Sequence, residues 1–88
     1  MDRLFLSVTG MHPERGATII EPEEAAVFRV MVRQAREVIV VSDSSKMGMV
    51  SPAIICLPRD IDLLITDDGI ENDTARAFEA AGVRIMTV

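Results

Sequence analysis

Residues 38–46 constrain the fold of this chain more than any other segment. A nearly continuous β-branched apolar run at 38–41 is followed, after one serine, by Asp43, two further serines and Lys46. An apolar run without polar alternation is typical of a strand in a parallel sheet, buried on both faces. Ligands of open α/β sheets bind beyond the carboxyl ends of such strands. We therefore expect a ligand-binding rim at residues 43–46.

The remaining pattern predicts strands and helices in alternation. We expect strands at 4–8, 38–42, 63–66 and 83–88, helices at 22–36 and 74–81, and short extended pieces at 17–20 and 53–57. Asn72 or Asp73 is expected to cap the second helix, and Gly82 to end it. The fold class is α/β, part of a doubly wound, mostly parallel sheet. About half of such a domain is present, so an uncovered sheet face or edge predicts a homo-oligomer.

Composition narrows the possible partners. The 88 residues allow one domain, and the net charge of −5, with Lys46 the only lysine and the arginines scattered, argues against a DNA-binding surface in this chain. The single cysteine, Cys56, lies in an apolar run and is predicted to be a buried thiol. With no signal peptide and no membrane-spanning run, we expect a cytoplasmic protein without a membrane partner.

The rim at residues 43–46 is the first candidate site. Lys46 can act as a point charge for a phosphate group, and Ser45 with nearby backbone N–H groups can donate to its oxygens. The alternative is a solvated turn in which Asp43 makes an ordinary Asx-type cap. Asp67 and Asp68, which follow a third strand, are interpreted as turn acids.

The loop after the first strand is the second candidate, because it leaves the same edge of the sheet. Thr9, Gly10 and His12 lie in it, although a lone histidine beside a proline is more often structural or merely exposed. Glu24 can bind sugar hydroxyls or simply complement the helix dipole. No second histidine or cysteine stands at ligand spacing, so we expect neither a metal site nor a cofactor.

Four segments in this order resemble a known family. Residues 9–18, 23–29, 42–48 and 61–69 are similar to the C-terminal effector domain of DeoR/GlpR-type bacterial transcriptional regulators, which usually show D-S-S-K-F-G, E-A-x-V-K-R and I-T-D elements. The resemblance covers essentially the whole chain. It implies a ribose-5-phosphate isomerase/CoA-transferase-like fold, the NagB/RpiA type, and a repressor that senses a phosphorylated sugar.

The resemblance also implies that DNA binding and effector binding belong to separate domains. DNA would be bound by a separate N-terminal winged helix, and residues 1–88 would be the C-terminal portion of the effector domain, without its first half. The implied ligand-binding set is Thr9, Gly10, His12, Glu24, Arg29, Asp43, Ser45 and Lys46. Where the related isomerases carry catalytic acids, this chain has Leu6, Thr9 and Phe28, none of which can abstract a proton, so we expect no enzyme. The alternatives are an isomerase-like fragment and an assembly-only module.

Overall fold

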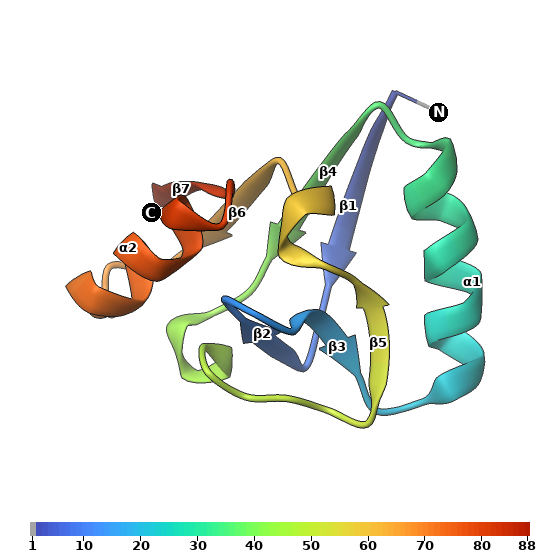
Figure 1. The fold of residues 1–88 in the computed structure, drawn as a ribbon, viewed down its shortest axis with the longest axis horizontal. Helices are drawn as coiled ribbons and strands as arrows, with labels where there is room; N and C mark the ends of the chain where they lie inside the picture. The colour runs from blue at the N-terminus through green and yellow to red at the C-terminus, as the bar shows by residue number, and fades with distance from the viewer. Residues whose placement is uncertain (1) are drawn as a thin grey trace.

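Four parallel strands form the main sheet of the computed structural model, which describes residues 2–88 (Figure 1). The sheet has the order β1-β4-β6-β7. Its strands are β1 (Arg3–Ser7), β4 (Glu37–Val41), β6 (Leu63–Thr66) and β7 (Arg84–Thr87). All three strand pairings are parallel, so the four predicted strands and the predicted fold class are confirmed.

A second, smaller sheet was not predicted. It is antiparallel, in the order β2-β3-β5, and consists of β2 (Gly10–His12), β3 (Gly16–Ile19) and β5 (Ala53–Cys56). β2 and β3 form a hairpin whose return begins at Gly16, where φ is +85°. Sequence patterning identified the two extended pieces near 17–20 and 53–57. It did not indicate that they pair, because the pairing joins segments more than 30 residues apart.

The two helices begin close to their predicted starts. α1 (Pro22–Gln34) packs against β5 and β3, and α2 (Asn72–Ala80) packs against β7. Two short 3-10 turns follow β4 and β5: η1 (Ser44–Lys46) and η2 (Pro58–Asp60). The predicted cap of α2 is wrong, because Glu71 occupies the N-cap position and makes no side-chain cap hydrogen bond. Gly82 ends this helix as predicted, with φ of +98°.

One face of the parallel sheet carries the core, and the other is open. Leu4, Leu6, Val40 and Leu64 are buried on the core face, and Figure 1 shows the small sheet lying between α1 and α2. The other face presents Phe5, Val41 and Met86, with exposed fractions of 62%, 44% and 49%. The expectation that the strand at 38–42 is buried on both faces holds for Ile39, which lies on this second face and is 5% exposed, and is wrong for Val41.

Candidate functional site

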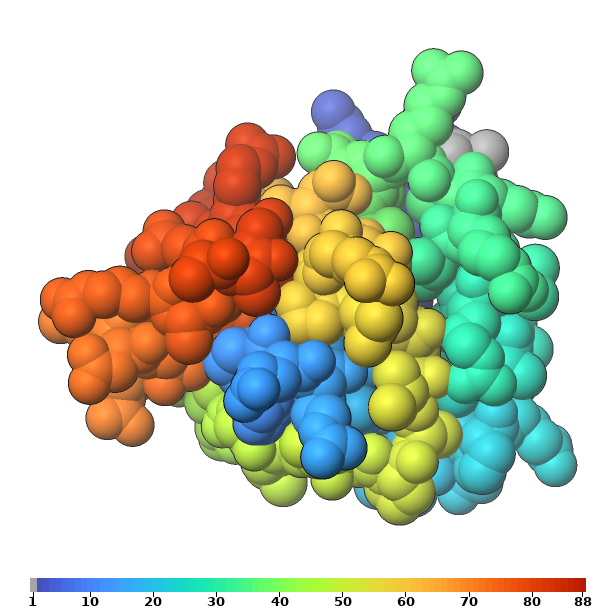
Figure 2. Space-filling model, viewed as in Figure 1, coloured from blue at the N-terminus to red at the C-terminus, as the bar shows by residue number. Residues whose placement is uncertain are grey.

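The two predicted rim segments meet at the carboxyl edge of the parallel sheet. After β4, the Ser42 N–H donates to the Ile65 carbonyl over 3.0 Å, which prolongs the ladder to β6. Beyond η1, the Gly48 N–H donates to the Met11 carbonyl of β2 over 2.7 Å, and Met11 and Met47 form a parallel bridge. The turn that carries Lys46 is thus held between β6 and the hairpin. Figure 2 shows this hairpin packed in the middle of one molecular face.

Thr9 and Gly10 join the hairpin to residues 47–51. The Thr9 and Ser51 hydroxyls lie 2.7 Å apart, and the Ser51 N–H donates to the buried Thr18 hydroxyl over 2.9 Å. A Cβ at Gly10 would lie 2.5 Å from the Met49 carbonyl oxygen, so only glycine fits this close approach. Sequence reasoning missed the roles of Thr18 and Ser51, since their contact joins residues 33 positions apart.

The η1 turn presents its polar side chains outward. The Ser45 hydroxyl donates to the Asp43 carboxylate, and the Lys46 and Met47 N–H groups close the turn on the carbonyls of Asp43 and Ser44. Lys46 is half-buried, and within residues 2–88 its ammonium makes no ion pair and no hydrogen bond to a protein acceptor. A lysine so placed is open to an external anion.

Asp67, interpreted above as a turn acid, has a larger role in the structure. Its Oδ2 accepts the Ser44 N–H over 2.9 Å, and its Oδ1 accepts the Gly69 N–H over 2.8 Å. Hydrogen bonding from the Ser44 side chain, from the Ser44 N–H and then from the Gly69 N–H lowers the pKa of Asp67. Asp67 therefore joins the end of β6 to the start of η1. A pairing across 23 residues leaves no local signal in the sequence.

The His12 side chain hydrogen-bonds within its own β2–β3 hairpin. Its Nδ1 accepts the N–H groups of Glu14 over 3.0 Å and of Arg15 over 3.3 Å, so this nitrogen caps the turn and the other carries the proton when the ring is neutral. This geometry favours a structural role for His12. Its Nε2 takes no part in these two hydrogen bonds.

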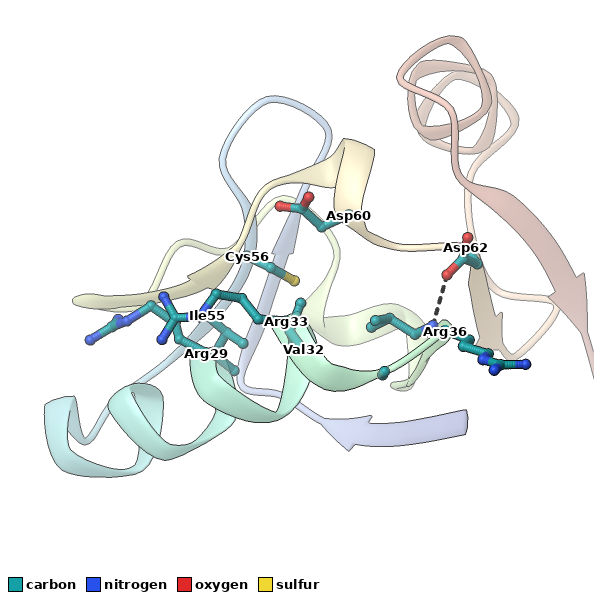
Figure 3. Close-up of a pocket in the computed structure, with 10 residues that line it drawn as sticks. Arg29, Val32, Arg33, Arg36, Ile55, Cys56, Asp60 and Asp62 are labelled. Carbon is teal, nitrogen blue, oxygen red and sulfur yellow. Dashed lines mark hydrogen bonds between the residues drawn. The ribbon is translucent and has the colours of Figure 1, made fainter. Parts of the chain in front are cut away.

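Glu24 and Arg29 lie on α1. Glu24 is exposed in the first turn, and the Arg29 guanidinium donates to the Ile54 carbonyl of β5 over 2.6 Å. Arg29 lines a cavity of about 400 Å³ between α1 and β5, shown in Figure 3. This cavity reaches Val38 and Asp62 at the amino ends of β4 and β6, the edge opposite Lys46. Within residues 2–88 neither Glu24 nor Arg29 makes a hydrogen bond or an ion pair with a rim residue.

Cys56 lies at the same cavity and is buried, as predicted, with 6% of its surface exposed. Burial, together with the nearby Asp60 carboxylate, raises the pKa of the Cys56 thiol to about 12, so it is a packing residue rather than a nucleophile. Among residues 2–88 no three histidine, cysteine or acidic side chains converge on a common point where a metal ion could be held.

Comparison with known families covers most of the chain. Residues 1–68 match the model of the DeoR C-terminal sensor domain. The chain belongs to the DeoR C-terminal sensor domain family. Sensor domains of this family have the NagB/RpiA/CoA-transferase-like fold, so both the predicted resemblance and the predicted fold are confirmed.

The relatives of this DeoR-type chain are named as transcriptional regulators. It is 38% identical over 87 residues to the putative aga operon transcriptional repressor of Escherichia coli O157:H7, matching 99% of this chain and 32% of that protein. It is 35% identical over 85 residues to the HTH-type transcriptional regulator GlpR of Haloferax volcanii, matching 97% of this chain and 33% of that protein. The HTH-type transcriptional repressor GlcR of Bacillus subtilis is 40% identical over 67 residues, which are 76% of this chain and 26% of GlcR.

The chain thus spans about a third of the length of the curated relatives it matches. Among the residues that the structure describes, no helix has the length and apolar character needed to cross a membrane.

Proposed function

We propose that this chain is the ligand-binding portion of a DeoR-type transcriptional repressor that senses a phosphorylated sugar without converting it. The observation that carries the proposal is that Lys46 sits on a fixed turn while its ammonium has no protein partner within residues 2–88. Its turn is hydrogen-bonded to both β6 and β2, yet its ammonium has no protein acceptor within residues 2–88. A single cation held in this way at the carboxyl edge of a parallel sheet suits a ligand phosphate.

The other proposed residues divide by their contacts. Asp43 and Ser45, hydrogen-bonded to each other beside Lys46, would meet ligand oxygens directly. Thr9 and Gly10 would shape the facing wall through their contacts with residues 47–51, and His12 would add its Nε2. Glu24 and Arg29 would contact the polyol or hold the neighbouring segments in place, as Arg29 does through its hydrogen bond to the Ile54 carbonyl of β5.

Substitution of Lys46 tests this proposal. We expect Lys46→Ala to weaken binding of ribose 5-phosphate, glucose 6-phosphate or fructose 6-phosphate at least tenfold by calorimetry, about 1.4 kcal/mol, because a charge-assisted contact is lost. Arg59→Ala is the matched control, since it removes one exposed positive charge outside the rim. Unchanged affinity in Lys46→Ala would refute the proposal.

The rival function is isomerisation. Leu6, at one of the places where the related isomerases carry acids, is 1% exposed, and Phe28 packs against the core. Neither side chain can act as a base, and the Thr9 hydroxyl is shared with Ser51. We expect no ketose when the chain, or the longer protein it belongs to, is incubated with aldose phosphates; turnover at ordinary enzyme rates would favour the rival.

DNA binding is proposed to lie elsewhere in the polypeptide. The acidic charge of −5 does not suit a DNA surface, and the matched relatives are about three times as long. We place this chain as the C-terminal portion of the effector domain in a cytoplasmic repressor, with a winged helix and the first half of the domain preceding it. The ligand would shift the populations of the repressor conformations because it binds one of them more tightly than the others.

Self-association is a second proposed activity, favoured by the open sheet face. Parallel sheets are almost always covered on both faces, and here Phe5, Val41 and Met86 are left exposed on one of them. A second copy packed on this face would bury them, which makes a homo-oligomer the expected state. Sedimentation of the chain at increasing concentration tests this, and a monomer throughout would rule it out.

A further inference from the structure

The turn that carries Lys46 is attached to the rest of the molecule at two points. On one side Gly48 donates to Met11 of β2, over 2.7 Å. On the other, the Asp67 carboxylate accepts the Ser44 N–H over 2.9 Å. Lys46 lies between these two attachments, so both determine the position of its Cα atom and hence the direction of its side chain.

The attachment through Asp67 is tightly packed. Asp67 is itself held by the Gly69 N–H, which donates to its second carboxylate oxygen over 2.8 Å. A Cβ at Gly69 would lie 2.8 Å from the Ser44 hydroxyl oxygen and equally close to Asp67 Oδ1. Glycine at this position therefore lets the end of β6 and the start of η1 approach each other.

We infer that Asp67 is a positioning residue for anion binding: its carboxylate fixes the Ser44–Lys46 turn so that the Lys46 ammonium faces the ligand. This inference rests on the proposed function, because it assigns Lys46 the role of anion contact. Asp67 would act only through Ser44 and the turn.

Electrostatics makes this inference sharply testable. Asp67 is an anion close to a site for an anion, so removing its charge should by Coulomb's law alone strengthen phosphate binding. Loss of the turn geometry should weaken it. The two explanations predict opposite signs for the same substitution.

The experiment compares Asp67→Ala with Asp68→Ala in the 88-residue chain. Asp68 is the matched control because it is the next residue, is exposed, and donates or accepts no side-chain hydrogen bond within residues 2–88. We expect Asp67→Ala to raise the Kd for glucose 6-phosphate about tenfold and Asp68→Ala to leave it unchanged or lower it. Asp67→Asn, which keeps an oxygen acceptor for Ser44, should recover part of the affinity.

Amide hydrogen exchange of Ser44 is the second readout, since it needs no ligand. We expect exchange at least tenfold faster in Asp67→Ala than in Asp68→Ala, with unchanged circular dichroism. Unchanged Ser44 exchange, or tighter phosphate binding by Asp67→Ala, would overturn the inference. If Lys46→Ala binds normally, the proposed function fails, and Ser44 exchange still decides whether Asp67 holds the turn.

Discussion

Asp67 and Asp68 show how far two identical neighbouring residues can differ. Asp68 is exposed, whereas the Asp67 carboxylate accepts hydrogen bonds from Ser44 and Gly69. These bonds favour the ionised form, and for that reason the pKa of Asp67 is lowered. The contribution of these hydrogen bonds to the free energy of unfolding therefore depends on pH.

We expect acid to weaken the fold partly through Asp67. Because its pKa is lower in the folded chain, its contribution to stability is complete above the unfolded value, near 4, and is lost as the pH falls through the folded value. Urea midpoints measured from pH 7 to pH 2.5 should fall less steeply for Asp67→Asn than for the wild type. Asp68→Asn should follow the wild type, and parallel curves for all three chains would contradict this assignment.

Among the helices, α2 depends most on a single side chain. Phe78 is its one buried residue, with no exposed surface, and it joins the core cluster beside Leu64 and Val83. α2 has nine residues and no side-chain N-cap, so its own hydrogen bonds would not hold it in water. Packing of Phe78 is therefore what keeps α2 on the sheet.

Phe78→Ala should cost about 3–5 kcal/mol of unfolding free energy, a large share of the roughly 4–13 kcal/mol expected for a domain of this size. Phe5→Ala is the matched control, since Phe5 is 62% exposed on the open face and should change stability by less than about 0.5 kcal/mol. Urea unfolding at low protein concentration, followed by circular dichroism, measures both. Equal losses in the two variants would show that α2 is held in some other way.

The complete fold has an asymmetric sheet. Both helices and the small antiparallel sheet contribute to one core cluster, which includes Ala17, Ala25, Ile55 and Phe78. On the opposite face the exposed apolar side chains follow the strands, with the ion pair between Arg3 and Glu37, at 3.0 Å, near the amino ends. Such a face is stable in water only if its apolar area remains small or becomes covered.

A lysine on this face should prevent association. We expect Val41→Lys to raise the dissociation constant of the oligomer at least tenfold by sedimentation equilibrium, because an ammonium would be buried against the second copy. Val30→Lys is a closely matched control, since Val30 on α1 is also a valine with 44% of its surface exposed. Equal weakening by both variants would place the contact elsewhere.

The parallel sheet and the helices follow from local patterns. The β-branched run at 38–41, the apolar segment at 63–66 and the helix signals at Pro22 and Gly82 each act over a few residues, so periodicity and end residues were enough to predict them. The meeting of the segment after β4 with the loop after β1, seen in the bridge between Met47 and Met11, also followed, because parallel strands bring their carboxyl ends to one edge.

Contacts between distant segments had no such local signal. Three contacts join residues more than 20 positions apart: the pairing of β3 with β5, the hydrogen bond from Ser44 to Asp67 and the hydrogen bond from Arg29 to β5. Each depends on how elements pack once their apolar faces are buried, and the spacing of residue types along a chain does not encode that packing. For this reason residue order was enough to predict the family and the meeting of the two rim segments, whereas folding in three dimensions determined which side chains hold those segments in place.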